Sequence, residues 1–162
     1  MRRFLLALLF VLLLVPATAE SPLVGHPAPA FERKDLNGQT VALGKLRGKV
    51  VLLNFWATWC APCQAEMPTF DRWQQELGAQ GLAVVGVSMD DDAAPVRKLA
   101  GRLRIHYPLL MGDAPLGERY GGVLGLPLTL LIDRQGRVRN RFQGETAPGK
   151  ILAALKPLLA ER

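Results

Sequence analysis

Both cysteines of the 162-residue chain, Cys60 and Cys63, lie in the pentapeptide WCAPC. A disulfide between them closes a very small loop and therefore adds little stability. A structural zinc site needs four ligands, and the two histidines, His26 and His106, stand far apart with no ligand spacing. The pair is therefore predicted to carry out thiol–disulfide redox chemistry. We expect no metal and no other cofactor.

The cysteine pair stands where a buried strand is expected to lead into a helix. The run KVVLLNFWA, residues 49–57, is apolar and rich in β-branched and aromatic residues, as in a strand buried on both faces. Apolar side chains then recur at near-helical spacing, at Met67, Phe70, Trp73 and Leu77. Cys60 should lie at the N-terminus of this helix, where unpaired N–H groups and the helix dipole stabilise a thiolate. We predict that Cys60 is the exposed nucleophile and that Cys63, one turn further on, is the resolving thiol.

The rest of the chain alternates between strand and helix patterns. Asn37-Gly38 predicts a hairpin near the N-terminus. Buried strands are expected at 82–89 and 128–133, with a shorter strand at 107–112 and a half-exposed one at 137–144. Helices are expected at 93–104, 116–120 and 147–159. This order predicts an α/β fold with a central mixed sheet, helices on both faces and an N-terminal β-hairpin extension.

Three consecutive aspartates, Asp90 to Asp92, follow the second buried strand. They are placed to cap the next helix and to complement its dipole. A metal site at these carboxylates is the alternative that the pattern leaves open.

The N-terminal residues have the layout of a secretory signal. Arg2 and Arg3 precede a twelve-residue apolar run, Phe4 to Val15, and small residues follow at 17–19. The run is short for a membrane span, which needs about 20 residues. We expect a signal peptide at residues 1–19 and one domain at 20–162. An uncleaved N-terminal anchor stays open as the alternative.

The formal net charge is +6, from 20 basic and 14 acidic residues. The basic residues are scattered, and an exported protein seldom meets nucleic acid, so we expect no nucleic-acid partner. The length suits a single compact domain, and we expect a monomer.

The WCAPC motif after a buried strand, with GLP before a later strand, resembles the thioredoxin superfamily from about Leu23 to Leu159. The longer stretch LNFWATWCAPCQAEMP and the leader GHPAPAFERKDLNGQTVALGKLRGK are similar to the TlpA/ResA/CcmG group of exported or membrane-tethered reductases. The resemblance implies a thiol–disulfide oxidoreductase in the periplasm that reduces protein disulfides. Its substrate would be apocytochrome c or a copper-site assembly protein. Its electron donor would be a membrane protein with its own thiols, since the chain has no further cysteine.

The resemblance also implies roles for individual residues. Pro127 would be a cis-proline facing the disulfide, and the backbone of Leu126 would pair with the substrate. Glu66, three residues after Cys63, would move protons at the resolving thiol. A solvent-facing helix glutamate is the other interpretation of that residue.

Three further positions bear on the site. Trp59 is predicted to form an apolar docking surface, and Trp56 is predicted to be part of the core. Asn54 departs from thioredoxin, which has a buried aspartate at the matching position.

Three other functions are compatible with parts of the pattern. A peroxiredoxin would have Thr or Ser where this chain has Ala57. A copper chaperone of the Sco type would space its cysteines by three residues and add a distal histidine. A strongly oxidising disulfide donor often has a histidine between its cysteines, where this chain has Ala61-Pro62. Strict CcmG identity is in doubt because Leu128 stands where that branch usually has glutamate.

Overall fold

The computed structural model describes residues 23–122 and 125–161, so the expected signal peptide at 1–19 lies outside the described residues. The strands are β1 (Glu32–Lys34), β2 (Thr40–Ala42), β3 (Val50–Trp56), β4 (Leu82–Ser88), β5 (Leu109–Met111), β6 (Leu128–Ile132) and β7 (Val138–Gln143). The helices are α1 (Ala61–Leu77), α2 (Ala93–Leu103), α3 (Ala114–Arg119) and α4 (Pro148–Ala160), with short 3-10 helices at Leu43–Leu46 and Gly78–Gln80. No helix in the described part of the chain is long and apolar enough to span a membrane.

Five strands form the central sheet in the order β5-β4-β3-β6-β7. Strand β3 runs parallel to β4 and antiparallel to β6, and β6 and β7 form an antiparallel pair. Every residue of β3 and β4 is buried. Their continuous apolar runs follow from this position, because both faces of the sheet are covered. The predicted α/β fold with a mixed sheet is confirmed.

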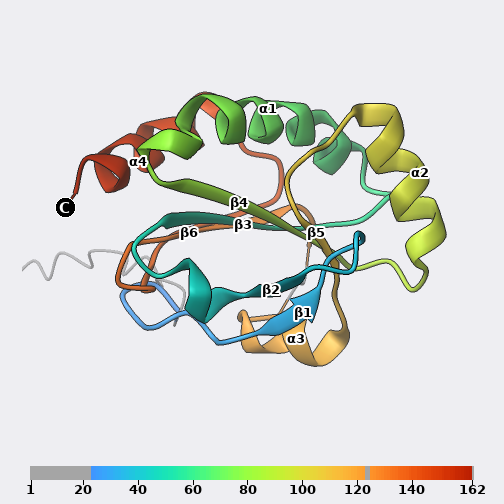
Figure 1. Ribbon diagram of the computed structural model, residues 1–162, viewed down its shortest axis with the longest axis horizontal. Helices are drawn as coiled ribbons and strands as arrows, with labels where there is room; N and C mark the ends of the chain where they lie inside the picture. Colours follow the sequence, from blue (N-terminus) through green and yellow to red (C-terminus); the bar gives the residue numbers. More distant parts are fainter. Residues whose placement is uncertain (1–22, 123–124, 162) are drawn as a thin grey trace, which may run out of the picture.

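Alternate residues of β3 supply two separate cores. Leu52 and Trp56 pack with α1, α2 and α4, whereas Leu53 and Phe55 pack with α3 and the N-terminal segment. Figure 1 shows this division, with α1, α2 and α4 on one side of the sheet and β1, β2 and α3 on the other. A strand has a side-chain period of two, so residue parity alone decides which core each side chain enters.

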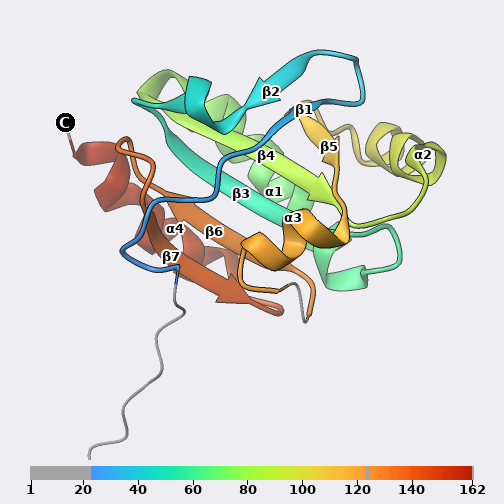
Figure 2. The same ribbon diagram turned by 90° about the horizontal axis from the view of Figure 1, so that it is seen from below.

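The N-terminal extension is an antiparallel pair, β1 with β2. Asp35 Oδ1 accepts hydrogen bonds from the backbone N–H groups of Asn37 and Gln39, each at 2.8 Å. Gly38 has a φ of +82°, which glycine adopts without strain. The predicted hairpin is thus confirmed, and Figure 2 shows it at one edge of the sheet, with β1 beside β5.

Candidate active site

Cys60 and Cys63 form a disulfide at the start of α1, with their Cα atoms 5.3 Å apart. Cys60 is the N-cap residue, and Pro62 lies in the first turn, where its missing N–H removes no helical hydrogen bond. The N–H of Cys63 points at Cys60 Sγ from 3.3 Å. The sulfur of Cys60 therefore occupies the position where a helix N-terminus favours negative charge.

Both cysteines are buried in the oxidised protein, so the expectation that Cys60 is exposed is wrong, because its side chain packs into the core with α1. Cys63 is completely buried, whereas Cys60 keeps 5% of its surface exposed. The neighbouring Trp59 is 71% exposed, which is unusual for so large an apolar side chain. The small exposed area of the disulfide therefore belongs to Cys60, whose neighbour in the chain is the exposed Trp59.

The loop before Cys60 is held by a carboxylate from another strand end. Asp90 accepts hydrogen bonds from the Thr58 N–H at 2.9 Å, the Thr58 hydroxyl at 2.5 Å and the Ser88 hydroxyl at 2.7 Å. From the other side, Gln64 Nε2 donates to the Thr58 carbonyl at 2.7 Å. These contacts fix the backbone that carries Cys60.

The three consecutive aspartates therefore do different things. Asp92 caps α2 by accepting from the Ala94 N–H at 3.0 Å, which confirms the predicted cap. Asp90 instead anchors the cysteine loop, a role that the sequence analysis missed. In residues 23–122 and 125–161 no group of three or more His, Cys, Asp or Glu residues is placed to hold a metal.

Pro127 follows a cis peptide bond from Leu126 and lies at the same end of the sheet as the cysteines. Strand β6 starts one residue later, with Leu128 opposite Phe55 at the end of β3 that leads to Cys60. The Pro127 carbonyl accepts from the Gly144 N–H at 2.8 Å. The cis geometry expected of Pro127 is present, and its role in binding a substrate stays a prediction.

Glu66 lies on the buried face of α1, with 6% of its surface exposed, so the solvent-facing interpretation is wrong. It follows Cys63 by three residues, and side chains at this spacing share one face of a helix. Burial raises its pKa from 4.5 to about 7, and the negative charge of Glu145 adds to the rise. A hydrogen bond from Asn54 Nδ2, at 2.8 Å from Oε1, acts in the opposite direction. The carboxyl group therefore changes its protonation near neutral pH.

Asn54 and Thr129 complete the buried polar group around Glu66, and the sequence analysis assigned neither a role. They are direct partners in the β3–β6 ladder, and Asn54 Nδ2 donates to Thr129 Oγ1 at 3.0 Å. Asn54 is completely buried and Thr129 is 1% exposed. One signal was available: each is the single polar residue of an otherwise apolar strand, VVLLNFW and LTLLI.

Two other residues, Trp56 and His106, differ sharply in burial. Trp56 is completely buried, as predicted for a core residue. His106 is exposed, and its hydrogen-bond partner lies 35 residues away in the sequence. Its backbone N–H donates to Asp71 Oδ1 at 2.6 Å, and its Nδ1 lies 3.0 Å from Oδ2. Burial raises the pKa of Asp71, but these contacts and one from Gln75 outweigh burial and lower it overall.

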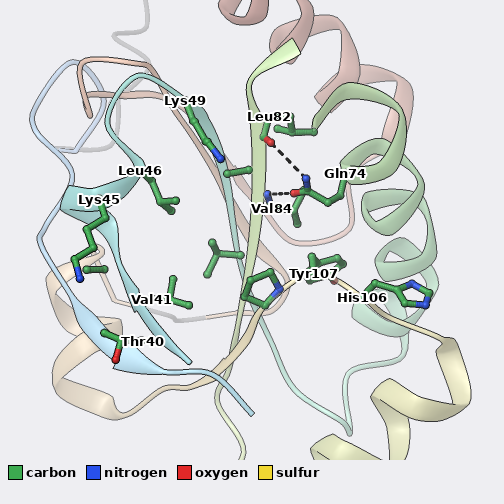
Figure 3. A pocket seen from close by; sticks show the side chains of 14 residues that line it. Thr40, Val41, Lys45, Leu46, Lys49, Gln74, Leu82, Val84, His106 and Tyr107 are labelled. Carbon is green, nitrogen blue, oxygen red and sulfur yellow. Dashed lines mark hydrogen bonds between the residues drawn. The ribbon is translucent and has the colours of Figure 1, made fainter. Parts of the chain in front are cut away.

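A cavity of about 380 Å³ lies at the edge of β4 that β5 does not reach (Figure 3). There the Gln74 side chain pairs with the strand, since the Val84 N–H donates to Oε1 at 2.7 Å and Nε2 donates to the Leu82 carbonyl at 3.4 Å. The carboxamide thus occupies the place of a neighbouring strand. Neither cysteine lines this cavity, which is therefore separate from the disulfide site.

Comparison with known proteins agrees with this geometry. The model of the AhpC/TSA family matches residues 24–141. The chain is 35% identical over 137 residues to the thiol-disulfide oxidoreductase ResA of Geobacillus thermodenitrificans, which covers 83% of this chain and 79% of that protein. It is 42% identical over 135 residues to the thiol:disulfide interchange protein DsbE of Yersinia pestis. This match spans 80% of this chain and 69% of that protein.

A crystal structure shows the same fold. The thiol:disulfide interchange protein, a thioredoxin family protein of Chlorobium tepidum, superimposes with a TM-score of 0.76 at 27% identity, over 87% of this chain and 99% of that one. The fold, the disulfide at the start of α1 and these relatives agree: the chain belongs to the AhpC/TSA family of the thioredoxin superfamily, among relatives that are thiol–disulfide oxidoreductases.

Proposed function

We propose that this protein is an exported thiol–disulfide oxidoreductase that reduces disulfides in other exported proteins. The observation that carries the proposal is the placement of the Cys60–Cys63 disulfide: Cys60 is the N-cap of α1 and keeps a small exposed area, whereas Cys63 is completely buried one turn along. A thiolate is stabilised at the first position. A resolving thiol is protected from outside reagents at the second.

The proposed cycle starts from the reduced dithiol. The Cys60 thiolate attacks one sulfur of the substrate disulfide and expels the other as a thiolate, which leaves a mixed disulfide. Cys63 loses its proton and attacks Cys60 Sγ, which expels the second substrate thiolate. Two electrons have then passed to the substrate, and the protein is left as the Cys60–Cys63 disulfide. Two more electrons from an external dithiol return it to the reduced state.

Glu66 is the proposed acceptor of the Cys63 proton. A carboxyl group with a pKa of about 7 is partly ionised at neutral pH, so it takes up a proton and releases it again within one cycle. Cys63 is completely buried and Glu66 is 6% exposed, so the carboxylate is the proposed base for this thiol. Glu66 therefore acts at the resolution step, after Cys60 has already reacted.

Three residues form the proposed substrate-binding surface. The exposed indole of Trp59 offers an apolar contact beside Cys60. The backbone of Leu126 pairs with an extended stretch of the substrate, and the cis bond to Pro127 turns the chain there. Main-chain pairing of this kind tolerates many substrate sequences.

The cellular setting is proposed on the basis of the N-terminal sequence and the named relatives. The site of action is the periplasm, with the signal either cleaved or kept as an anchor to the inner membrane. The substrates are apocytochrome c or a copper-site assembly protein, and the electron donor is a membrane thiol protein.

Trapping of the mixed disulfide tests this function. Cys63→Ser keeps the nucleophile and removes the resolving thiol, so covalent adducts with exported proteins should accumulate in the native host and dissolve in dithiothreitol. Cys60→Ser is the matched control and should trap far less. Mass spectrometry of the adducts then names the substrates.

The same variants distinguish the rival functions. If the protein is a peroxidase, the wild-type form should consume hydrogen peroxide rapidly, and the Cys63→Ser variant should give few protein adducts. A copper chaperone would bind copper as the wild type and lose it in both cysteine variants. Either result, together with a lack of adducts, would overturn the reductase proposal.

A further inference from the structure

Glu66 contacts a polar pair whose position follows from the alternation of side chains along β3. Asn54 lies on the face of β3 that carries Leu52 and Trp56, and this face packs under α1. Thr129 lies directly opposite Asn54 in the antiparallel ladder, so their side chains are neighbours on that face. Glu66 comes from α1 above them. Three elements far apart in the sequence thus meet in one buried polar group.

In this group Asn54 is the hydrogen-bond donor, and Glu66 and Thr129 are the acceptors. The Asn54 amide nitrogen has two hydrogens, and it has two acceptors: Glu66 Oε1 at 2.8 Å and Thr129 Oγ1 at 3.0 Å. Both donors of a completely buried amide are therefore used. With the amide turned by 180°, the Asn54 oxygen would face the ionised carboxylate, and two acceptors would oppose each other. The ionised carboxylate selects the observed orientation, whereas the Thr129 hydroxyl, which can accept or donate, fixes the position of the amide beside the carboxylate.

Resting on the function proposed above, we propose that Asn54 is the positioning residue that keeps Glu66 able to carry a proton, and that the Thr129 hydroxyl anchors the Asn54 amide within reach of the carboxylate. The amide donates to the ionised carboxylate and so stabilises it inside the protein. Without that donor, Glu66 would hold its proton at neutral pH and could not take one from Cys63.

The other groups that face Glu66 do not replace this donor. Glu145, in the segment after β7, carries a negative charge that opposes ionisation. Tyr107, before β5, stays uncharged, because burial and the charge of Glu66 both raise its pKa. Cys63, on the same helix, is held in the disulfide. Among these influences within the described residues, the Asn54 hydrogen bond is the one that favours the carboxylate.

The test is a carbon-13 NMR titration of the Glu66 carboxyl carbon in the oxidised protein, which needs no substrate. The wild-type midpoint is expected at about pH 7. Asn54→Leu should raise it by about one unit or more, because burial is then unopposed. Asn54→Asp should also raise it, because two carboxyl groups then share one site. Thr129→Val should raise it by less, and Thr129→Ser, which keeps the hydroxyl, should leave it at the wild-type value.

An unchanged midpoint in Asn54→Leu, or in Asn54→Asp if the leucine variant does not fold, would overturn the inference for Asn54. An equal rise in Thr129→Ser and Thr129→Val would overturn the role of the hydroxyl. The pH profile of disulfide exchange is measured separately on the same variants. If the midpoint moves but the exchange profile does not, the proposed catalytic role of Glu66 fails while the inference about Asn54 holds.

Discussion

The backbone N–H of Cys63 points at the sulfur of Cys60 from 3.3 Å, inside the disulfide that joins the two residues. This contact places Cys60 Sγ at the positive end of α1, while Cys63 is buried one turn along the helix. The two cysteines are therefore unequal before any substrate arrives. Helix geometry, burial and the anchored loop before Cys60 all favour reaction at the same sulfur.

This inequality predicts different alkylation rates in the reduced protein. At pH 7 Cys60 should react with iodoacetamide faster than Cys63 and faster than a free cysteine, because the helix N-terminus stabilises its thiolate. Peptide mapping after short exposures measures both rates. Faster modification of Cys63 would reverse the assigned roles.

The resolution step should depend on the ionisation of Glu66. Its raised pKa, about 7, means that the carboxylate exists mainly above neutral pH, so resolution of a mixed disulfide should accelerate as pH rises through about 7. Glu66→Gln should slow this step and remove the acceleration near pH 7. Stopped-flow measurement from pH 5 to pH 9 provides the comparison. Identical profiles for the two proteins would leave Glu66 without a catalytic role.

The same shift predicts a change in stability with pH. A carboxyl group with a folded pKa of about 7 and an unfolded pKa near 4.5 binds its proton more tightly in the folded protein. Its contribution is thus fully present below pH 4.5 and is lost as pH rises through 7. Relative to wild type, oxidised Glu66→Gln should gain about 3 kcal/mol in free energy of unfolding between pH 4 and pH 8. Urea unfolding at the two pH values measures the gain, and a constant difference would mean that Glu66 titrates normally.

The anchor of the cysteine loop can be tested with neighbouring carboxylates. Asp90→Ala leaves the Thr58 N–H and two hydroxyl groups without their acceptor, which should cost about 1–3 kcal/mol of stability. Asp91→Ala, at the next position and exposed, is the matched control and should change stability little. Equal urea midpoints for the two variants would show that Asp90 does not hold the loop.

Local patterns were sufficient to predict the scaffold. The apolar runs of β3 and β4 predicted buried strands, and Asn37-Gly38 predicted the hairpin, because each feature depends on residues close in sequence. The cysteine pair was also evident from its spacing. The predicted ends of elements differ by one or two residues, as at α4, which starts at Pro148 rather than Ala147, and at α3, which starts at Ala114 rather than Leu116.

The polar contacts around the site could not be predicted in the same way. Asn54 meets Thr129 across 75 residues of sequence, and Asp90 meets Thr58 across 32. His106 meets Asp71 across 35. Each pairing is set by how strands and helices pack, and no local period encodes it. A lone polar residue in a buried strand marks such a position, but it does not name the partner.

The standard reduction potential of the Cys60–Cys63 couple tests the central claim most directly. A dithiol that donates electrons to substrate disulfides needs a low potential, closer to that of thioredoxin, about −270 mV, than to that of the oxidant DsbA, about −120 mV. Equilibration with glutathione or dithiothreitol buffers, followed by the change in tryptophan fluorescence, measures it. The account predicts a value near that of thioredoxin. A value near that of DsbA would mean that the protein forms disulfides in its partners, which would contradict the reductase assignment.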